Sequence, residues 1–159
     1  MGGETMKYIS FAIPCYNSEA YMEKAINSIL VGGGEDVEIL VVNDGSKDGT
    51  QKIAERYQEK YPTIVKAINK ENGGHGDAVN CGLQHATGKY FKVVDSDDWV
   101  DKDSLVKILD AIKGFVDADS GVDMIIANYV YEKVGMEHKK VIRYDNVLPE
   151  NQIFRWDDI

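Results

Sequence analysis

The chain has 159 residues, of which 43% are hydrophobic and 28% are charged, proportions typical of a globular protein with a buried core. Eighteen basic and 27 acidic residues give a net charge of −9, which argues against a protein that tracks nucleic-acid phosphates. No stretch reaches the roughly 18 consecutive apolar residues of a transmembrane helix. Cys15 and Cys81 form neither a CxxC pair nor a disulfide framework, so we expect a cytoplasmic protein.

Short β-branched runs alternate with helical periods along most of the chain. Strands are predicted at 8–13, 37–42, 65–68, 90–94 and 124–130, and amphipathic helices at 22–30, 53–61, 78–86 and 105–112. Pro14 is expected to end the first strand, because proline cannot donate to a ladder. The alternation predicts an α/β, Rossmann-like fold, with a mostly parallel central sheet and helices on both faces. The pattern weakens after residue 135, where 139–144 is at best an edge strand.

Polar or glycine-rich segments follow four of the predicted strands. They are Cys15-Tyr16-Asn17, Asn43-Asp44-Gly45-Ser46, residues 69–77 and Asp95-Ser96-Asp97-Asp98. Because ligands of such sheets bind at the carboxyl ends of the strands, we expect all four segments to meet at one candidate site.

The acidic segment is the strongest indication of chemistry. Asp95 and Asp97 can present the hard oxygen ligands that Mg²⁺ or Mn²⁺ prefers, with positions left open for substrate phosphates. Asp98 can join them or remain only solvated, and Asp101 or Asp103 is expected to cap the following helix.

Asp44 and the glycine-rich segment each allow two interpretations. Asp44 can accept a hydrogen bond from a nucleotide base or a ribose hydroxyl, or it can be an ordinary turn residue. The glycines around His75 allow a close approach of backbone to ligand, and His75 can bind phosphate or sugar hydroxyls or simply face solvent. The spacing matches neither a Walker A loop nor a dinucleotide fingerprint. Cys15 and Cys81 are expected to be packed side chains rather than nucleophiles.

Taken in order, four motifs resemble family 2 glycosyltransferases of the GT-A fold. They are Ile13-Pro14-Cys15-Tyr16-Asn17, Val41-Val42-Asn43-Asp44-Gly45-Ser46, Asn72-Gly73-Gly74 and Asp95-Ser96-Asp97-Asp98, within a match that runs from about Tyr8 to Tyr131. The resemblance implies a nucleotide-diphosphate sugar donor, usually linked to UDP, a divalent cation and inversion at the anomeric carbon. It implies a saccharide, lipid or polymer acceptor, as in polysaccharide synthesis at the inner face of a membrane, and no nucleic-acid partner.

When the functional positions of the family are transferred to the matching positions of this sequence, the resemblance also implies a set of site residues. The expected donor-binding set is Pro14, Tyr16, Asn17, Asp44, Asn72, Gly73, Gly74, Asp95 and Ser96. Asp95 and Asp97 would be the two ends of a DxD motif that holds Mn²⁺ or Mg²⁺, with Asp97 as the direct ligand. Val79 stands where the family has an arginine, so a donor contact from that position is not carried over.

The reaction also needs a general base for the acceptor hydroxyl. Only Asp117, Asp119, Asp123 and the tail from Glu132 onward remain to supply it, and none follows a convincing strand. We therefore expect the catalytic base to lie outside this chain, with residues 1–6 a leader, 7–134 the nucleotide-sugar binding domain and 135–159 the start of an acceptor-side region that is cut short. Such a chain should bind donor but transfer sugar very poorly.

Two alternatives remain at this point. One is a phosphatase of the haloacid dehalogenase type, which also places Asp-x-Asp after a buried strand; Trp99 and the late position of the motif weigh against it. The other is a nucleotide-binding module without catalytic activity.

Overall fold

The computed structural model describes residues 5–132 and 137–158 of the chain. They fall into two units, Met1–Gly114 and Phe115–Ile159, and each is described by itself. The expected leader lies outside the described residues except for residues 5 and 6, as does the predicted boundary between 134 and 135. In chain order, the elements of the first unit are β1 (Ile9–Cys15), α1 (Met22–Gly33), η1 (Gly34–Asp36), β2 (Val37–Asp44), α2 (Thr50–Lys60), β3 (Val65–Lys70), α3 (His75–His85), β4 (Tyr90–Val93) and α4 (Lys102–Asp117). The last helix of the first unit, α4, continues three residues into the second unit.

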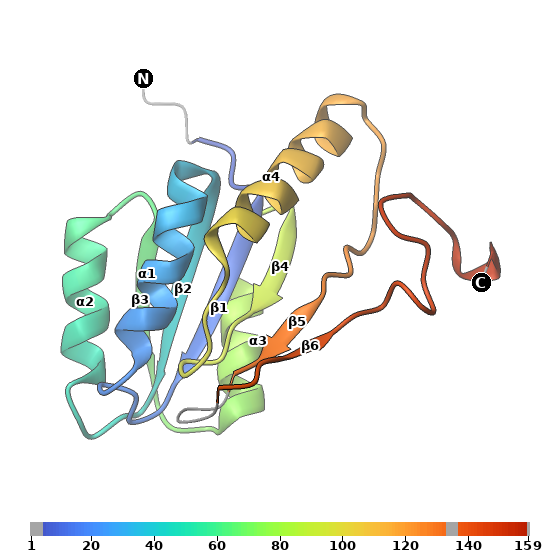
Figure 1. Ribbon diagram of the computed structural model, residues 1–159. Helices are drawn as coiled ribbons and strands as arrows, with labels where there is room; N and C mark the ends of the chain where they lie inside the picture. The colour runs from blue at the N-terminus through green and yellow to red at the C-terminus, as the bar shows by residue number, and fades with distance from the viewer. Residues whose placement is uncertain (1–4, 133–136, 159) are drawn as a thin grey trace. The chain divides into compact units, whose positions relative to one another are not determined.

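The sheet of the first unit has four strands in the order β3-β2-β1-β4. All three pairings are parallel; Ile13 lies opposite Val41, for example, and Asp44 lies opposite Lys70. α1 and α2 cover one face of the sheet and α3 covers the other (Figure 1). The predicted α/β architecture with a parallel central sheet is therefore confirmed.

Apolar periodicity explains which surfaces are buried. The stripe predicted for the first helix becomes the buried face of α1: Met22, Ala25, Ile26 and Ile29. All eight residues of β2 are buried, as expected for a strand covered on both faces. Glu38 and Asp44 are the charged residues of β2, and Ser10, Thr87 and Lys66 surround the carboxylate of Glu38.

Pro14 does not end the first strand, contrary to the sequence prediction. It lies within β1 opposite Val42, while the pairing of β1 with β4 ends at Ala12 and Val93. The carbonyl of Ala12 accepts from the amide of Val94, so even-numbered residues of β1 direct their backbone groups toward β4. The backbone nitrogen of Pro14 therefore faces the space beyond the end of β4. Because β4 has no carbonyl there that needs a donor, the absence of an N–H on Pro14 costs no hydrogen bond.

The second unit contains a short antiparallel pair, β5 (Tyr129–Tyr131) and β6 (Lys140–Ile142), and a 3-10 turn, η2 (Trp156–Asp158). Of the strand predicted for 124–130, only the last two residues belong to β5, which pairs with the three residues of β6. Large apolar side chains are exposed in this unit. Trp156, for example, is 66% exposed, and its ring is perpendicular to that of Phe154 in a T-shaped contact. None of the helices in the described residues is long and apolar enough to cross a membrane.

Candidate functional site

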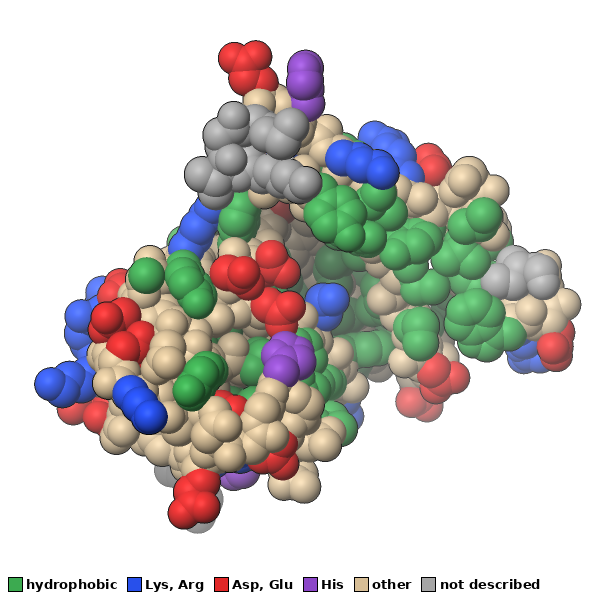
Figure 2. All heavy atoms as spheres, turned by 90° about the horizontal axis from the view of Figure 1, so that it is seen from below, with side chains coloured by type: hydrophobic (Ala, Val, Ile, Leu, Met, Phe, Trp, Pro, Cys, Tyr) green, Lys and Arg blue, Asp and Glu red, His purple; other side chains and the backbone are tan. Residues whose placement is uncertain are grey.

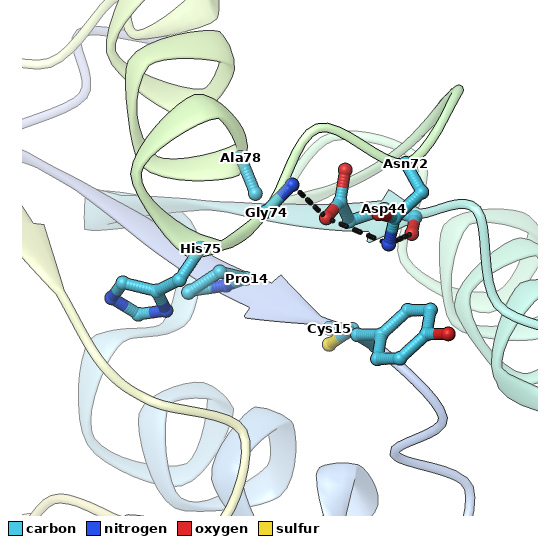
Figure 3. Close-up of a pocket in the computed structure, with 8 residues that line it drawn as sticks. Pro14, Cys15, Asp44, Asn72, Gly74, His75 and Ala78 are labelled. Carbon is cyan, nitrogen blue, oxygen red and sulfur yellow. Dashed lines mark hydrogen bonds between the residues drawn. The ribbon is translucent and has the colours of Figure 1, made fainter.

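A cavity of about 360 Å³ opens at the carboxyl end of the parallel strands in the first unit. The ends of β1 and β2, the loops that follow β1 and β3, and the start of α3 supply its lining: Pro14, Cys15, Tyr16, Asp44, Asn72, Gly74, His75 and Ala78. Figure 3 shows His75 beside Pro14 at one end of the cavity and Asp44 with Asn72 at the other. The predicted convergence is thus observed for the segments at the ends of β1, β2 and β3.

Asp44 is the most strongly held side chain of this cavity. Only 2% of the residue is exposed, and its two oxygens accept four hydrogen bonds. Oδ1 accepts from Nζ of Lys70 and from the amide of Gly73, each at 2.8 Å, and Oδ2 accepts from the amide of Gly74 at 2.8 Å and from Nδ2 of Asn72 at 3.3 Å. Burial by itself would raise the pKa of Asp44, but the hydrogen bonds from Lys70, Gly73 and Gly74 outweigh it and hold the pKa below the usual value. Asp44 is therefore ionised at neutral pH and fixes the glycine loop.

Gly45 makes this loop geometry possible. Its φ of +68° is a left-handed conformation, and a Cβ at this position would lie 2.7 Å from the amide nitrogen of Asn72. The two loops can approach each other this closely only with glycine at position 45.

A second set of hydrogen bonds joins the loop after β1 to the loop after β2. Asn17, which has a φ of +49°, accepts from the amide of Lys47 at 2.9 Å and donates its own amide to Oγ of Ser46 at 3.0 Å. The amide of Ser18 donates to Thr50, and Glu19 accepts from the amide of Gly49. Asn17 thus fastens two loops of the site together.

The acidic segment after β4 lies next to the start of α3. Nε2 of His75 is 3.7 Å from Oδ1 of Asp95, and Oγ of Ser96 is 2.9 Å from Oγ of Ser18. Asp95 and Asp97 are both exposed. Figure 2, which views this edge of the sheet, shows acidic side chains gathered beside a histidine.

The charges of this segment are not balanced within it. Burial raises the pKa of Asp98, and the neighbouring carboxylates of Asp97 and Asp95 raise it further. Accessible carboxylate oxygens with uncompensated charge fit a hard divalent cation that keeps waters and phosphate oxygens among its ligands. Within the described residues, however, no three His, Cys, Asp or Glu side chains are grouped as a preformed metal site. Ligands from the substrate or from water would have to complete the coordination.

The remaining predicted residues have structural partners as well. Gly73 points its amide at Asp44, and Asp101 accepts from the amide of Ser104 at 2.8 Å, which confirms it as the cap of α4. Burial raises the pKa of Cys15 to about 12, so its thiol stays protonated, as expected of a packed side chain.

Sequence reasoning missed Lys70 and Ala78. Lys70 ends β3 and contacts both Asp44, at 2.8 Å, and Asp77, at 2.5 Å. Its hydrogen bonds to Asp44 and then to Asp77 raise the pKa of its ammonium. No signal in the sequence identified Lys70, because the register that places position 70 opposite position 44 belongs to the tertiary structure. For Ala78 the only signal was its place in the first turn of α3.

Comparison with known proteins gives consistent matches. The model of the family "Glycosyl transferase family 2" matches residues 10–155. An uncharacterised glycosyltransferase of Rickettsia conorii is 34% identical over 147 residues, covering 91% of this chain and 23% of the relative. The minor teichoic acid biosynthesis protein GgaB of Bacillus subtilis is 37% identical over 102 residues, covering 63% of this chain and 11% of the relative.

Two solved structures share the fold. TarS of S. aureus in complex with UDP-GlcNAc is 32% identical, with a TM-score of 0.58, over 70% of this chain and 31% of that chain. The mannosyltransferase PcManGT of Pyrobaculum calidifontis, in complex with GDP-Man and Mn²⁺, is 26% identical, with a TM-score of 0.58, over 70% of this chain and 33% of that chain. The chain spans well under half the length of each of these proteins. With a family model that matches most of its length, the chain belongs to glycosyl transferase family 2.

Proposed function

We propose that this chain binds a nucleotide-diphosphate sugar, with UDP as the nucleotide, as the donor-binding part of an inverting glycosyltransferase. The observation that carries the proposal is the cavity at the carboxyl end of the sheet, with the ionised Asp44 at one end and His75, close to Asp95, at the other. A relative in complex with UDP-GlcNAc supports the donor class.

The base of the nucleotide is assigned to the end of the cavity formed by Asp44 and Asn72. A carboxylate has about four acceptor positions, and Asp44 already accepts four hydrogen bonds. Two come from the backbone and two from the side chains of Lys70 and Asn72, which can rotate. A uracil N3–H would therefore replace one of the two side-chain donors. Pro14 and Tyr16 line the cavity beside them.

The diphosphate is assigned to the opposite end. There Asp95 and Asp97 would hold Mn²⁺ or Mg²⁺, which as a Lewis acid would offset the negative charge of the departing nucleoside diphosphate. The raised pKa of Asp98 and the exposure of Asp95 and Asp97 support this assignment, and a relative in complex with GDP-Man and Mn²⁺ agrees with it. Ser96, held to Ser18, and Asn17 would position the loops around the donor.

The chemical step would be a displacement at the anomeric carbon. An acceptor hydroxyl oxygen bonds to that carbon, the bond to the diphosphate oxygen breaks, and the hydroxyl proton passes to a general base. Asp117, Asp119 and Asp123 belong to the second unit, and no contact among the described residues assigns the base to any of them.

The same proposal assigns a role to each of the two segments predicted from the sequence. Residues 7–134 would form the donor-binding domain and 135–159 would begin the acceptor side. An acceptor in a cell-envelope polymer, at the inner face of the membrane, agrees with a relative named for minor teichoic acid biosynthesis.

Isothermal titration of the chain with UDP, GDP and dTDP, with and without Mn²⁺, tests the proposal. UDP should bind most tightly and only in the presence of the metal. Equal or undetectable binding of all three nucleotides would contradict it. Phosphate release from a generic ester would indicate a phosphatase instead, and steady transfer of sugar from a UDP-sugar by this chain would contradict the expectation that the general base lies outside it.

A further inference from the structure

His75 has a position in the cavity that the assignments above leave without a role. It is the first residue of α3, and it lines the cavity together with Asp44, Asn72 and Pro14. Its side chain is 65% exposed, so packing does not account for its orientation. Nε2 lies 3.7 Å from Oδ1 of Asp95, which is longer than a hydrogen bond.

The second histidine of the same helix provides a contrast. His85 lies in the last turn of α3, and its Nδ1 is 2.8 Å from the carbonyl oxygen of Cys81, within its own helix. The ring of His85 therefore has a local structural partner. Nε2 of His75 instead lies 3.7 Å from a carboxylate oxygen of Asp95, which belongs to another loop, and Figure 3 shows the ring at the Pro14 end of the cavity.

Two other side-chain donors near the cavity, those of Asn72 and Lys70, are already engaged. Nδ2 of Asn72 donates to the carbonyl oxygen of Asp44 at 2.9 Å. Nζ of Lys70 lies between the carboxylates of Asp44 and Asp77. Among the eight described residues that line the cavity there is no lysine or arginine; besides the amide of Asn72, the side-chain N–H and O–H donors are the ring of His75 and the hydroxyl of Tyr16. Any anion that enters the cavity therefore meets Asp44 and Asp95 with few side-chain donors to offset them.

We propose that His75 is a donor-binding residue whose ring N–H donates a hydrogen bond to a diphosphate oxygen of the nucleotide sugar. This assignment rests on the proposed function, because it requires the diphosphate to lie at the Asp95 end of the cavity. Asp95 and Asp97 would hold the cation at this same end, and the ring N–H of His75 would add a hydrogen bond to the diphosphate there. The base and ribose, at the Asp44 end, would not contact His75.

The position of the neighbouring helical residues agrees with this role. Ala78 and Val79 follow His75 by three and four positions, which places them on the same face of α3. Both are apolar, Ala78 is buried, and neither can donate a side-chain hydrogen bond. His75 is therefore the residue through which this face of α3 can contact an anion.

Titration of the 159-residue chain with UDP and with uridine, each in Mn²⁺, tests the assignment. The variants are His75→Ala, His75→Gln and, as the matched control, His85→Ala. Hydrogen bonds to charged groups correspond to about a 10- to 100-fold change in affinity, so His75→Ala should weaken UDP binding by that factor. Uridine binding should be unchanged, since uridine has no phosphate. His75→Gln retains an N–H donor and should recover part of the loss, whereas His85→Ala should match the parent.

Further measurements separate the possible failures. Thermal unfolding of each variant should match the parent, because His75 is exposed; a folding defect would weaken uridine and UDP alike and overturn the assignment. Binding of Mn²⁺ alone, followed by electron paramagnetic resonance, should be the same for His75→Ala and parent. A loss of Mn²⁺ affinity equal to the loss of UDP affinity would make His75 a metal ligand instead. If the parent binds UDP and His75→Ala binds it equally well, only the role of His75 is wrong; if the parent binds no nucleotide, the proposed function fails as well.

Discussion

The ammonium of Lys70 lies 2.8 Å from Oδ1 of Asp44, directly across the register of β2 and β3. The same ammonium is 2.5 Å from Oδ2 of Asp77 in the first turn of α3. One side chain thus links two strands and a helix at the point where the glycine loop crosses the sheet. Because Asp44 also holds the amides of Gly73 and Gly74, this pair determines the shape of the cavity.

Acid should destabilise the chain through Asp44. The pKa of Asp44 is lower in the folded chain than its ordinary value of 3.8, so its contribution to the free energy of unfolding is complete above that value. The contribution is lost as the pH falls through the lower, folded pKa.

Urea denaturation from pH 7 to pH 2 should show stability falling below about pH 4, the ordinary range of an aspartate. Asp44→Asn should be less stable at pH 7 by about 1–3 kcal/mol and should show a shallower acid dependence. An unchanged acid dependence in the variant would assign the effect to other carboxylates, such as Asp48 and Glu38, whose pKa values are also lowered.

Asp44→Ala should weaken the binding of UDP selectively. If its carboxylate accepts the N3–H of uracil, its loss removes a contact to the base and loosens the loop from Asn72 to Gly74. We expect about a 10- to 100-fold loss of UDP affinity by calorimetry and a smaller loss for inorganic diphosphate with Mn²⁺. Equal losses for both ligands would mean that Asp44 acts only by holding the loop.

Asp97→Asn should remove the metal dependence of nucleotide binding. The neutral amide cannot replace an anionic oxygen ligand of a hard cation, so UDP affinity should become the same with and without Mn²⁺. Asp103→Asn, an acidic residue in the first turn of α4, is the matched control and should retain the parent's dependence. If Asp97→Asn binds UDP as tightly as the parent in Mn²⁺, Asp97 is not a metal ligand.

Gly45→Ala and Gly114→Ala should have opposite effects on stability. Alanine at position 45 would adopt a strained φ and place Cβ against the backbone of Asn72, so it should lower both stability and UDP affinity. A Cβ at Gly114, inside α4, meets nothing within 4 Å, and alanine favours helix by about 0.5–1 kcal/mol. Urea denaturation measures both changes. A Gly45→Ala chain as stable as the parent would show that the loops can separate without cost.

The parallel sheet of the first unit, with helices on both faces, was predictable from the sequence, and so was the meeting of strand-end segments at one edge. Apolar periodicity reports which face of a helix or strand is buried, and parallel strands must bring their carboxyl ends to one edge; Met22 to Ile29 and the run of β2 follow from this alone. The partners of the polar residues were decided only by the tertiary structure. Lys70 meets Asp44, His75 meets Asp95, and Ser18 meets Ser96 across 78 positions of sequence. Pro14 is accepted inside β1 because its neighbour β4 has already ended. Such contacts depend on strand order, on register and on the path of the loops. Local periodicity carries no information about these three features, so it cannot show which distant residues lie close together.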